Sequence, residues 1–303
     1  MISIILRKAF IIVFLCVSYN VKAQEYKAGN FGKGLFYLEG ENNSWAMKIG
    51  LRFQTLLTNN WEATNGISNS ESSMLIRRSR LKFDGYAFSP KLVYKVELGL
   101  SNRDQAGASP YTSNSPRYIL DAVVKWNFSG NFVLWVGQTK LPGNRERIIS
   151  SGDLQMVDRS LLNSRFTIDR DIGIQLRHKT KLSNKFLMKE IFSISQGEGR
   201  NITTGNEGGY QFTGKVELLP FGNFSSKGDY KGGDLQFEKN SKLSFAVGYD
   251  LNMDAVKTRS NQGTYMNIDT GLYQTDISTI FIDAIYKYKG FSLMAEYANR
   301  NAD

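Results

Sequence analysis

The sequence has almost no cysteine or histidine. Its one cysteine, Cys16, lies in the first 23 residues, and His178 is its one histidine. Once those first residues are removed, the chain can form neither a disulfide nor a cysteine metal site. A single histidine also argues against a His-metal site and against a membrane-embedded lipolytic enzyme, whose base only His178 would supply. We therefore expect no enzyme activity, no bound metal and no other cofactor.

Proline and long apolar runs are also scarce. The mean hydropathy is −0.33, and no segment is apolar for long enough to cross a bilayer as a helix, which excludes a helical membrane protein. A soluble periplasmic protein fits these values equally well. The chain has only five prolines, however, together with 28 glycines and 13% aromatic residues. Transmembrane β-barrels need aromatic girdles and glycine and tolerate little proline in their strands, so this composition favours a barrel.

Residues 1–23 are predicted to be a cleaved signal peptide. Arg7 and Lys8 form a basic start, a short apolar run follows, and Val21-Lys22-Ala23 resembles a signal-peptidase site. The mature chain is therefore expected to begin at Gln24 and to be exported to the outer membrane of a bacterium. Residues 24–303 are expected to form a single outer-membrane β-barrel.

A two-residue period of apolar and polar side chains runs through the mature chain. In residues 45–53 the odd positions, from Trp45 to Phe53, are apolar, whereas Lys48, Gly50 and Arg52 occupy the other face. Such alternation predicts β-strands that present one face to lipid and the other to a lumen. Eleven segments are predicted as strands, with all five prolines between them: 45–53, 75–87, 92–100, 118–128, 132–140, 170–177, 186–195, 210–218, 243–249, 280–286 and 291–297.

The connections between the predicted strands differ in length. Short turns alternate with longer polar loops at 101–117, 143–169 and 252–275, which is typical of barrels with short periplasmic turns. Bacterial single-chain barrels have even numbers of strands, and here an odd number is followed almost at once by residue 303. We therefore expect the sequence to be incomplete at its C-terminus.

One predicted strand carries a row of basic residues. Arg78, Arg80 and Lys82 share one face with Asp84, and Arg77 has the opposite parity. A lipid-facing Arg or Lys costs about 2–4 kcal/mol at mid-membrane, so the row is expected in a wet lumen, with Arg77 at the membrane edge. A charged strand edge in a soluble β protein would give the same pattern.

The chain resembles the phosphate-selective porin O and P family. The resemblance covers most of the mature chain in four segments: the basic strand at 76–86, Gly137-Gln138-Thr139-Lys140-Leu141-Pro142 with Arg145 and Glu146, Arg170-Asp171-Ile172-Gly173-Ile174-Gln175-Leu176, and the weaker Phe212-Thr213-Gly214-Lys215-Val216-Glu217. It implies a homotrimer of sixteen-stranded barrels in outer-membrane lipid, of which eleven strands are visible here. It also implies a water-filled channel for the passive diffusion of small anions, phosphate or polyphosphate.

The candidate pore-lining residues are the basic residues on the predicted lumen face. Guanidinium and ammonium groups suit this role because rings of Arg and Lys select anions. The candidates are Arg78, Arg80, Lys82, Lys48, Arg52, Lys95, Lys125, Lys140, Arg177 and Lys215. Carboxylates on the same parity are expected to pair with some of them, namely Asp84, Glu97, Asp121, Glu217, Asp283 and Glu296.

Other functions stay open at this point. A porin of the same fold without selectivity, or one for organic solutes, has the same strand pattern. A soluble secreted β-sandwich that binds a ligand would also alternate. The basic balance of the chain, with a net charge of +10, is a feature of nucleic-acid-binding proteins. Interleaved carboxylates and export argue against a nucleic-acid partner.

Overall fold

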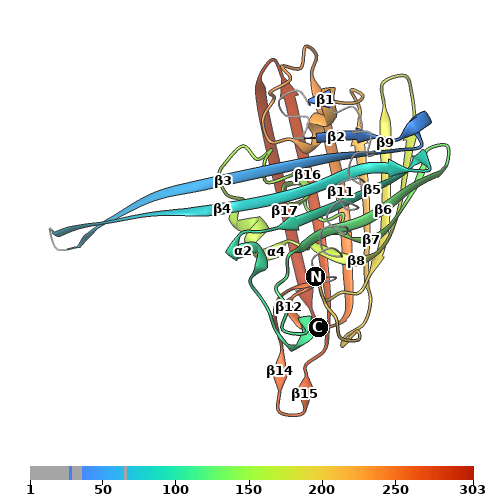
Figure 1. Ribbon diagram of the computed structural model, residues 1–303. Coiled ribbons are helices and arrows are strands. Elements are labelled where there is room, and N and C mark those ends of the chain that lie inside the picture. The colour runs from blue at the N-terminus through green and yellow to red at the C-terminus, as the bar shows by residue number, and fades with distance from the viewer. Residues whose placement is uncertain (1–26, 29–35, 65–66) are drawn as a thin grey trace, which may run out of the picture.

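The computed structural model describes residues 27–28, 36–64 and 67–303 (Figure 1). The predicted signal peptide at 1–23 lies outside the described residues. Thirteen strands form one sheet in the order β1 to β11, β16 and β17, and every neighbouring pair is antiparallel. The strands are β1 Lys27–Ala28, β2 Phe36–Glu39, β3 Trp45–Thr64, β4 Ile67–Ala87, β5 Ser89–Gly99, β6 Ile119–Ser129, β7 Phe132–Lys140, β8 Arg170–Lys181, β9 Leu187–Ser195, β10 Gln211–Leu219, β11 Lys242–Ala255, β16 Thr275–Tyr288 and β17 Phe291–Ala302.

The sheet curves into a barrel wall that is open between β17 and β1 in the part of the chain that the structure describes. Its eleven long strands, β3 to β11 with β16 and β17, fall on the eleven predicted segments. The prediction of an all-β, porin-like antiparallel barrel is therefore confirmed. The total of sixteen strands, which rests on the family resemblance, stays a prediction.

The faces of the sheet are inverted relative to a soluble protein. On β8 the outward side chain of Ile174 is 52% exposed, whereas Asp171 on the inner face is 1% exposed. On β3 the outward Phe53 is 63% exposed and the inner Ala46 only 3%. An apolar outer face and a polar interior suit a sheet surrounded by lipid. The alternative of a soluble β-sandwich, which buries its apolar faces against each other, is wrong.

Two predictions about individual strands were wrong. Pro90 was expected between strands, but it is the second residue of β5, a position near a strand start where a missing N–H is tolerated. The first hairpin is also longer than expected: β3 has 20 residues and β4 has 21, and together they project beyond the wall as a long arm (Figure 1). Polar contacts between the two strands continue along the arm. One of them is the 2.7 Å hydrogen bond between Thr58 and Ser73.

A β-bulge on β4 moves Arg77 to the inside. Gln54 pairs with Arg78 and Thr55 with Ile76, so Arg77 is the extra residue. A bulge shifts the alternation of side chains by one position. As a result Arg77 and Arg78 are both buried, and both form ion pairs with Asp158. The expectation that Arg77 lies at the membrane edge is therefore wrong.

The remaining elements are short helices and hairpins in the connections. The helices are η1 Glu41–Asn43, α2 Asn102–Gln105, η2 Pro110–Thr112, α3 Arg145–Ile148, α4 Leu161–Phe166 and η3 Ser225–Tyr230, and the hairpins are β12 Lys257–Arg259 with β13 Gln262–Tyr265 and β14 Asn267–Ile268 with β15 Gly271–Leu272. None of the helices in the described ranges is long and apolar enough to span a membrane. The two hairpins lie within the loop predicted at 252–275.

Two long connections fold into the barrel and pack against its inner wall. The segment 141–169, between β7 and β8, places Leu141 and Ile168 against Phe281 of β16. The segment 220–241, between β10 and β11, starts from the opposite end of the barrel and places Phe224 against Ile285 of β16. The two segments meet where the amide of Gly232 donates to the carbonyl of Asp153 at 2.6 Å. They therefore fill the lumen beside β16 and β17.

Candidate functional site

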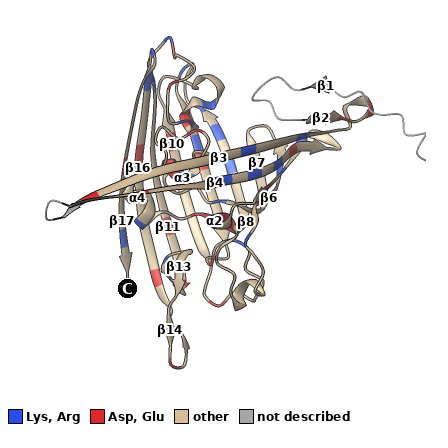
Figure 2. Cartoon of the chain, turned by 60° about the vertical axis from the view of Figure 1, so that its left-hand side comes forward, with Lys and Arg blue, Asp and Glu red and all other residues tan. Residues whose placement is uncertain are grey.

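A basic cavity of about 900 Å³ lies inside the barrel. Its walls come from β4 to β8, from the inserted segment 141–169 and from nearby loops, and Figure 2 shows Lys and Arg spaced along β3 and β4. Fifteen basic and five acidic residues line it. The cavity is therefore strongly positive even if every carboxylate is charged.

Seven of the ten candidate pore-lining residues line this cavity, namely Arg78, Arg80, Lys82, Lys95, Lys125, Lys140 and Arg177. The other three lie on the inner face outside it. Lys48 pairs in register with Asp84 of β4, and Arg52 donates to Ser150 at 3.2 Å and Ser151 at 2.8 Å. Lys215 is 2% exposed and its Nζ is 2.7 Å from Asp283 and 2.9 Å from the carbonyl of Gly143. Lys215 is thus placed to hold the inserted segment 141–169.

The basic row on β4 is paired with carboxylates. Arg78 lies 3.7 Å from Asp158, Arg80 lies 2.9 Å from Asp104, and Lys82 lies 3.6 Å from Glu97. The charge of this row is therefore largely compensated. Of the carboxylates expected to pair with lumen cations, Glu97, Asp121, Glu217 and Asp283 do so. Glu296 instead accepts hydrogen bonds from the amide of Glu146 and the side chain of Asn144.

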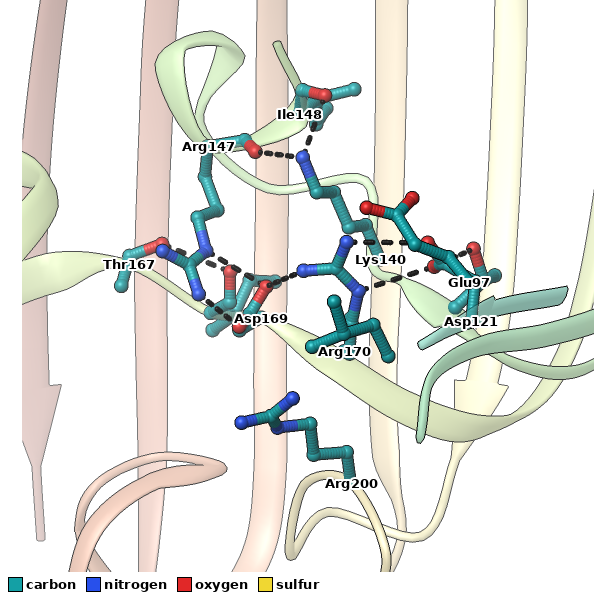
Figure 3. Close-up of polar contacts among 12 residues, drawn as sticks. Glu97, Asp121, Lys140, Arg147, Ile148, Thr167, Asp169, Arg170 and Arg200 are labelled. Atoms are coloured by element: carbon teal, nitrogen blue, oxygen red, sulfur yellow. Dashed lines mark hydrogen bonds and ion pairs between the residues drawn. The ribbon is translucent and has the colours of Figure 1, made fainter. Parts of the chain in front are cut away.

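The inserted segment 141–169 ends in a charged cluster at the start of β8 (Figure 3). Arg147 forms an ion pair with Asp169, and Arg170 binds Asp121 at 3.2 Å. Burial alone would raise the pKa of the Asp169 carboxyl, but Arg147 and Arg170 outweigh it and hold that pKa well below its usual range. Asp169 therefore stays ionised, and it compensates only part of the surrounding positive charge.

Lys140 lies in the same cluster but has a different environment. Its Nζ donates to the backbone carbonyls of Arg147, Ile148 and Ile149 at 2.7, 3.0 and 3.1 Å. Carbonyl oxygens satisfy the ammonium group without cancelling its charge. Lys140 therefore fixes the segment 141–169 in place, and Figure 3 shows its contacts with Arg147 and Ile148.

Eight of the basic residues that line the cavity have no ion-pair partner among the residues that the structure describes, because the five carboxylates pair with the other seven. Two of the eight, Arg159 and Arg200, lie in loops and donate to backbone carbonyls. Burial lowers the pKa of each to about 10, helped by neighbouring cations. Both therefore remain charged at neutral pH. The eight are Arg103, Lys125, Lys140, Arg159, Arg177, Arg200, Lys227 and Arg259.

Sequence reasoning missed most of these loop cations. Strand periodicity places Lys125, Lys140 and Arg177, but it carries no information about Arg159 or Arg200 in irregular loops. A signal for the inserted segments was present in β16, whose inward residues Ile277 and Phe281 are apolar although they face the lumen. An inner wall with apolar side chains predicts that some other part of the chain covers it.

The inserted segment 141–169 is anchored by a fully buried arginine. Arg145 in α3 donates to Asp283 at 2.6 Å, to Ser244 at 3.0 Å and to the carbonyl of Asp229 at 2.9 Å. Burial opposes its charge, but Asp283 and Glu217 outweigh burial, so the pKa of Arg145 is raised. The anchor therefore ties the segment 141–169 both to the barrel wall and to the segment 220–241.

The residues that the structure describes show neither a metal site nor a catalytic histidine. Within the described ranges no group of three or more His, Cys, Asp or Glu side chains is arranged to hold a metal ion. His178 lies outside the cavity, where its Nδ1 is 2.6 Å from Glu190 and its ring stacks on Phe132 at 4.0 Å. It has the surroundings of a structural residue at the rim of the outer face.

Comparison with known proteins identifies the family. No curated protein matches the chain. The sequence model of the family described as phosphate-selective porin O and P matches residues 47–303, which include the basic strand β4, the inserted segment 141–169 and the charged cluster at the start of β8. The chain therefore belongs to the phosphate-selective porin O and P family of the outer membrane, and it is a channel protein and not an enzyme.

Proposed function

We propose that the protein forms a water-filled channel through which small anions, phosphate or polyphosphate, cross the outer membrane by passive diffusion. One observation carries this proposal: eight of the cations that line the cavity have no ion-pair partner in the described ranges. An uncompensated set of this size attracts anions and excludes cations.

The geometry of the cavity suits oxyanions. Guanidinium groups match the oxygens of phosphate in a two-pronged arrangement, and several weak sites in series let an ion both enter and leave. The inserted segments occupy the lumen beside β16 and β17, so the path runs along the opposite wall, β4 to β8. There a moving anion would pass from one cation to the next.

We also propose that the protein is a homotrimer in outer-membrane lipid, exported by a signal peptide that is cleaved after Ala23. The support is the family and the apolar outer face, which includes Phe53 and Ile174. Mass spectrometry of outer-membrane material tests both parts: it should give a mature chain that starts at Gln24 and a native mass of three chains. Retained Cys16 or a native mass of one chain would contradict the respective part.

The proposed selectivity is tested in planar lipid bilayers under a KCl gradient. The reversal potential is expected to shift from zero toward the equilibrium potential of chloride. Added phosphate should then reduce the chloride current in a saturable manner. A reversal potential of zero would favour the alternative of a non-selective or organic-solute porin. A shift toward the equilibrium potential of potassium would contradict the proposal.

A further inference from the structure

Trp135 on β7 is the one tryptophan among the residues that line the cavity. The adjacent strand carries Trp126 on its opposite face, where it is 51% exposed on the outside of the barrel. Tryptophan is common at the outer girdles of barrels, whereas an inward tryptophan in a polar lumen has no lipid to face. The position of Trp135 therefore calls for a different explanation.

Two cations lie over the indole ring of Trp135. The Nζ of Lys125 is 4.0 Å from the ring centroid and the Cζ of Arg177 is 3.8 Å from it. They come from the two neighbouring strands, since Lys125 on β6 pairs in register with Trp135 and Arg177 on β8 pairs with Val133. Gln175, directly opposite Trp135, accepts a 2.8 Å hydrogen bond from Arg177.

Neither cation forms an ion pair with a carboxylate of the described chain, although both line the cavity. This contrasts with Lys95 on β5, which has Asp121 at 2.8 Å and Glu97 at 2.9 Å. The face of an aromatic ring stabilises a cation without carrying a negative charge. Trp135 therefore holds Lys125 and Arg177 in position as a carboxylate would, but it does not neutralise their charge.

We propose that Lys125, Trp135 and Arg177 form an anion-binding subsite in which one inorganic oxyanion bridges the two cations, and that Trp135 is the positioning residue of this subsite. The two charged groups are at most about 8 Å apart, because each is about 4 Å from the same ring centroid. The oxyanion would lie beside the edge of the ring, where it accepts one charge-assisted hydrogen bond of about 2.8 Å from each group. The inference rests on the proposed function and assigns one step of the path to named residues.

Indole fluorescence reports on this subsite directly. The chain has four tryptophans, Trp45, Trp61, Trp126 and Trp135. A variant of the full chain in detergent that keeps only Trp135, with the other three changed to phenylalanine, is titrated with inorganic phosphate at constant ionic strength. Its emission should change in a saturable manner as the cations move from the ring toward the anion. The matched control keeps only Trp126, on the opposite face of the neighbouring strand, and should not respond.

Substitutions then test the role of each residue. Lys125→Met and Arg177→Met should each raise the phosphate concentration for half-maximal response about tenfold, because each removes one charged hydrogen-bond donor. Lys91→Met removes an exposed charge outside the cavity near the same end of the barrel and should leave that concentration unchanged. For Trp135 itself, phosphate block of the chloride current is the readout: Trp135→Leu should weaken block, and Trp135→Phe should restore much of it because a ring face is retained.

The outcomes separate the subsite from the proposed function. An anion-selective channel whose Trp135 emission ignores phosphate would overturn the subsite and leave the proposed function standing. Equal phosphate block in Trp135→Leu and the parent would overturn the positioning role. A phosphate response of Trp135 in a channel without anion preference would support the subsite and overturn the proposed function.

Discussion

At the scale of single residues, charge compensation decides which cations matter for the proposed selectivity. Strand alternation alone predicts that Arg78, Arg80 and Lys82 form the core of the proposed path, but all three lie close to carboxylates. Arg159 and Arg200 are in loops and bind backbone carbonyls instead. A cation attracts anions in the lumen with its full charge only where its hydrogen-bond partner is neutral. A position on the inner face is therefore not sufficient to make a cation important for selectivity.

The bulge at Arg77 leads to a first prediction about charge reversal. Because Arg77 and Arg78 both line the cavity and share Asp158, Arg77→Glu and Arg78→Glu should shift the reversal potential toward cations by similar amounts. Leu81→Gln, on the outward face of the same strand, is the control and should not shift it. A shift in the Arg78 variant alone would mean that Arg77 does not face the conducting water.

The pKa values of the loop arginines predict how selectivity depends on pH. Burial lowers the pKa of Arg159 and of Arg200 to about 10, so both are charged below that value and lose their charge as pH rises through it. The contribution of these two arginines to the ratio of anion to cation permeability should therefore stay level from about pH 6 to 9 and fall above about pH 10. The difference in reversal potential between the parent and a variant with Arg159→Gln and Arg200→Gln measures this contribution, and loss of that difference already near pH 7 would contradict the prediction.

At the scale of elements, regular and irregular segments differ in how well the sequence predicts them. The eleven long strands were predicted from a local two-residue period, because an odd or even position along a strand is enough to assign a side chain to one face. The course of the segment 141–169 depends on Phe281 and Asp283, more than a hundred residues away, and no local pattern carries that contact. The bulge at Arg77 and the length of the β3–β4 arm were also missed, because a parity count assumes an unbroken ladder and apolar alternation ends before the arm does.

The anchor of the inserted segment leads to a prediction about the width of the channel. Arg145→Met removes one of the two cations that contact Asp283 and leaves only Lys215, 2.7 Å away, beside that buried carboxylate. Losing a hydrogen bond to a charged group costs about 1.5–3 kcal/mol. The segment 141–169 should come loose, giving a larger single-channel conductance with more noise and weaker selectivity. Arg165→Met, an exposed arginine on the same segment, is the matched control. Identical conductance in the two variants would show that Arg145 does not hold the segment.

At the scale of the whole molecule, assembly depends on which face of the wall meets lipid. Met47 and Lys48 are neighbours on β3, but Met47 is on the apolar outer face and Lys48 faces inward toward the register position of Asp84. This inversion of the usual arrangement, with polar groups inside and apolar groups outside, is what the sequence predicted most securely. It follows from composition and parity together and needs no knowledge of the loops.

The same inversion predicts how two adjacent substitutions affect assembly. Met47→Arg places a cation on the lipid face at a cost of about 2–4 kcal/mol at mid-membrane and should reduce the folded fraction. Lys48→Arg retains the inward charge and should assemble like the parent. Heat-modifiable gel mobility of outer-membrane fractions measures this, and equal folding of the two variants would contradict the assignment of faces.

The meeting of the two inserted segments at Asp153 and Gly232 also has an electrical consequence. In the proposed channel, the passage lies between the inserted segments and one wall of the barrel. It is then a narrow conductor in series with wider water on either side, so most of an applied voltage drops across it. The cations that line it therefore sit where the field is steepest. The same charge placed at either mouth of the barrel would act on ions that have yet to enter that voltage drop, and it would change the current far less.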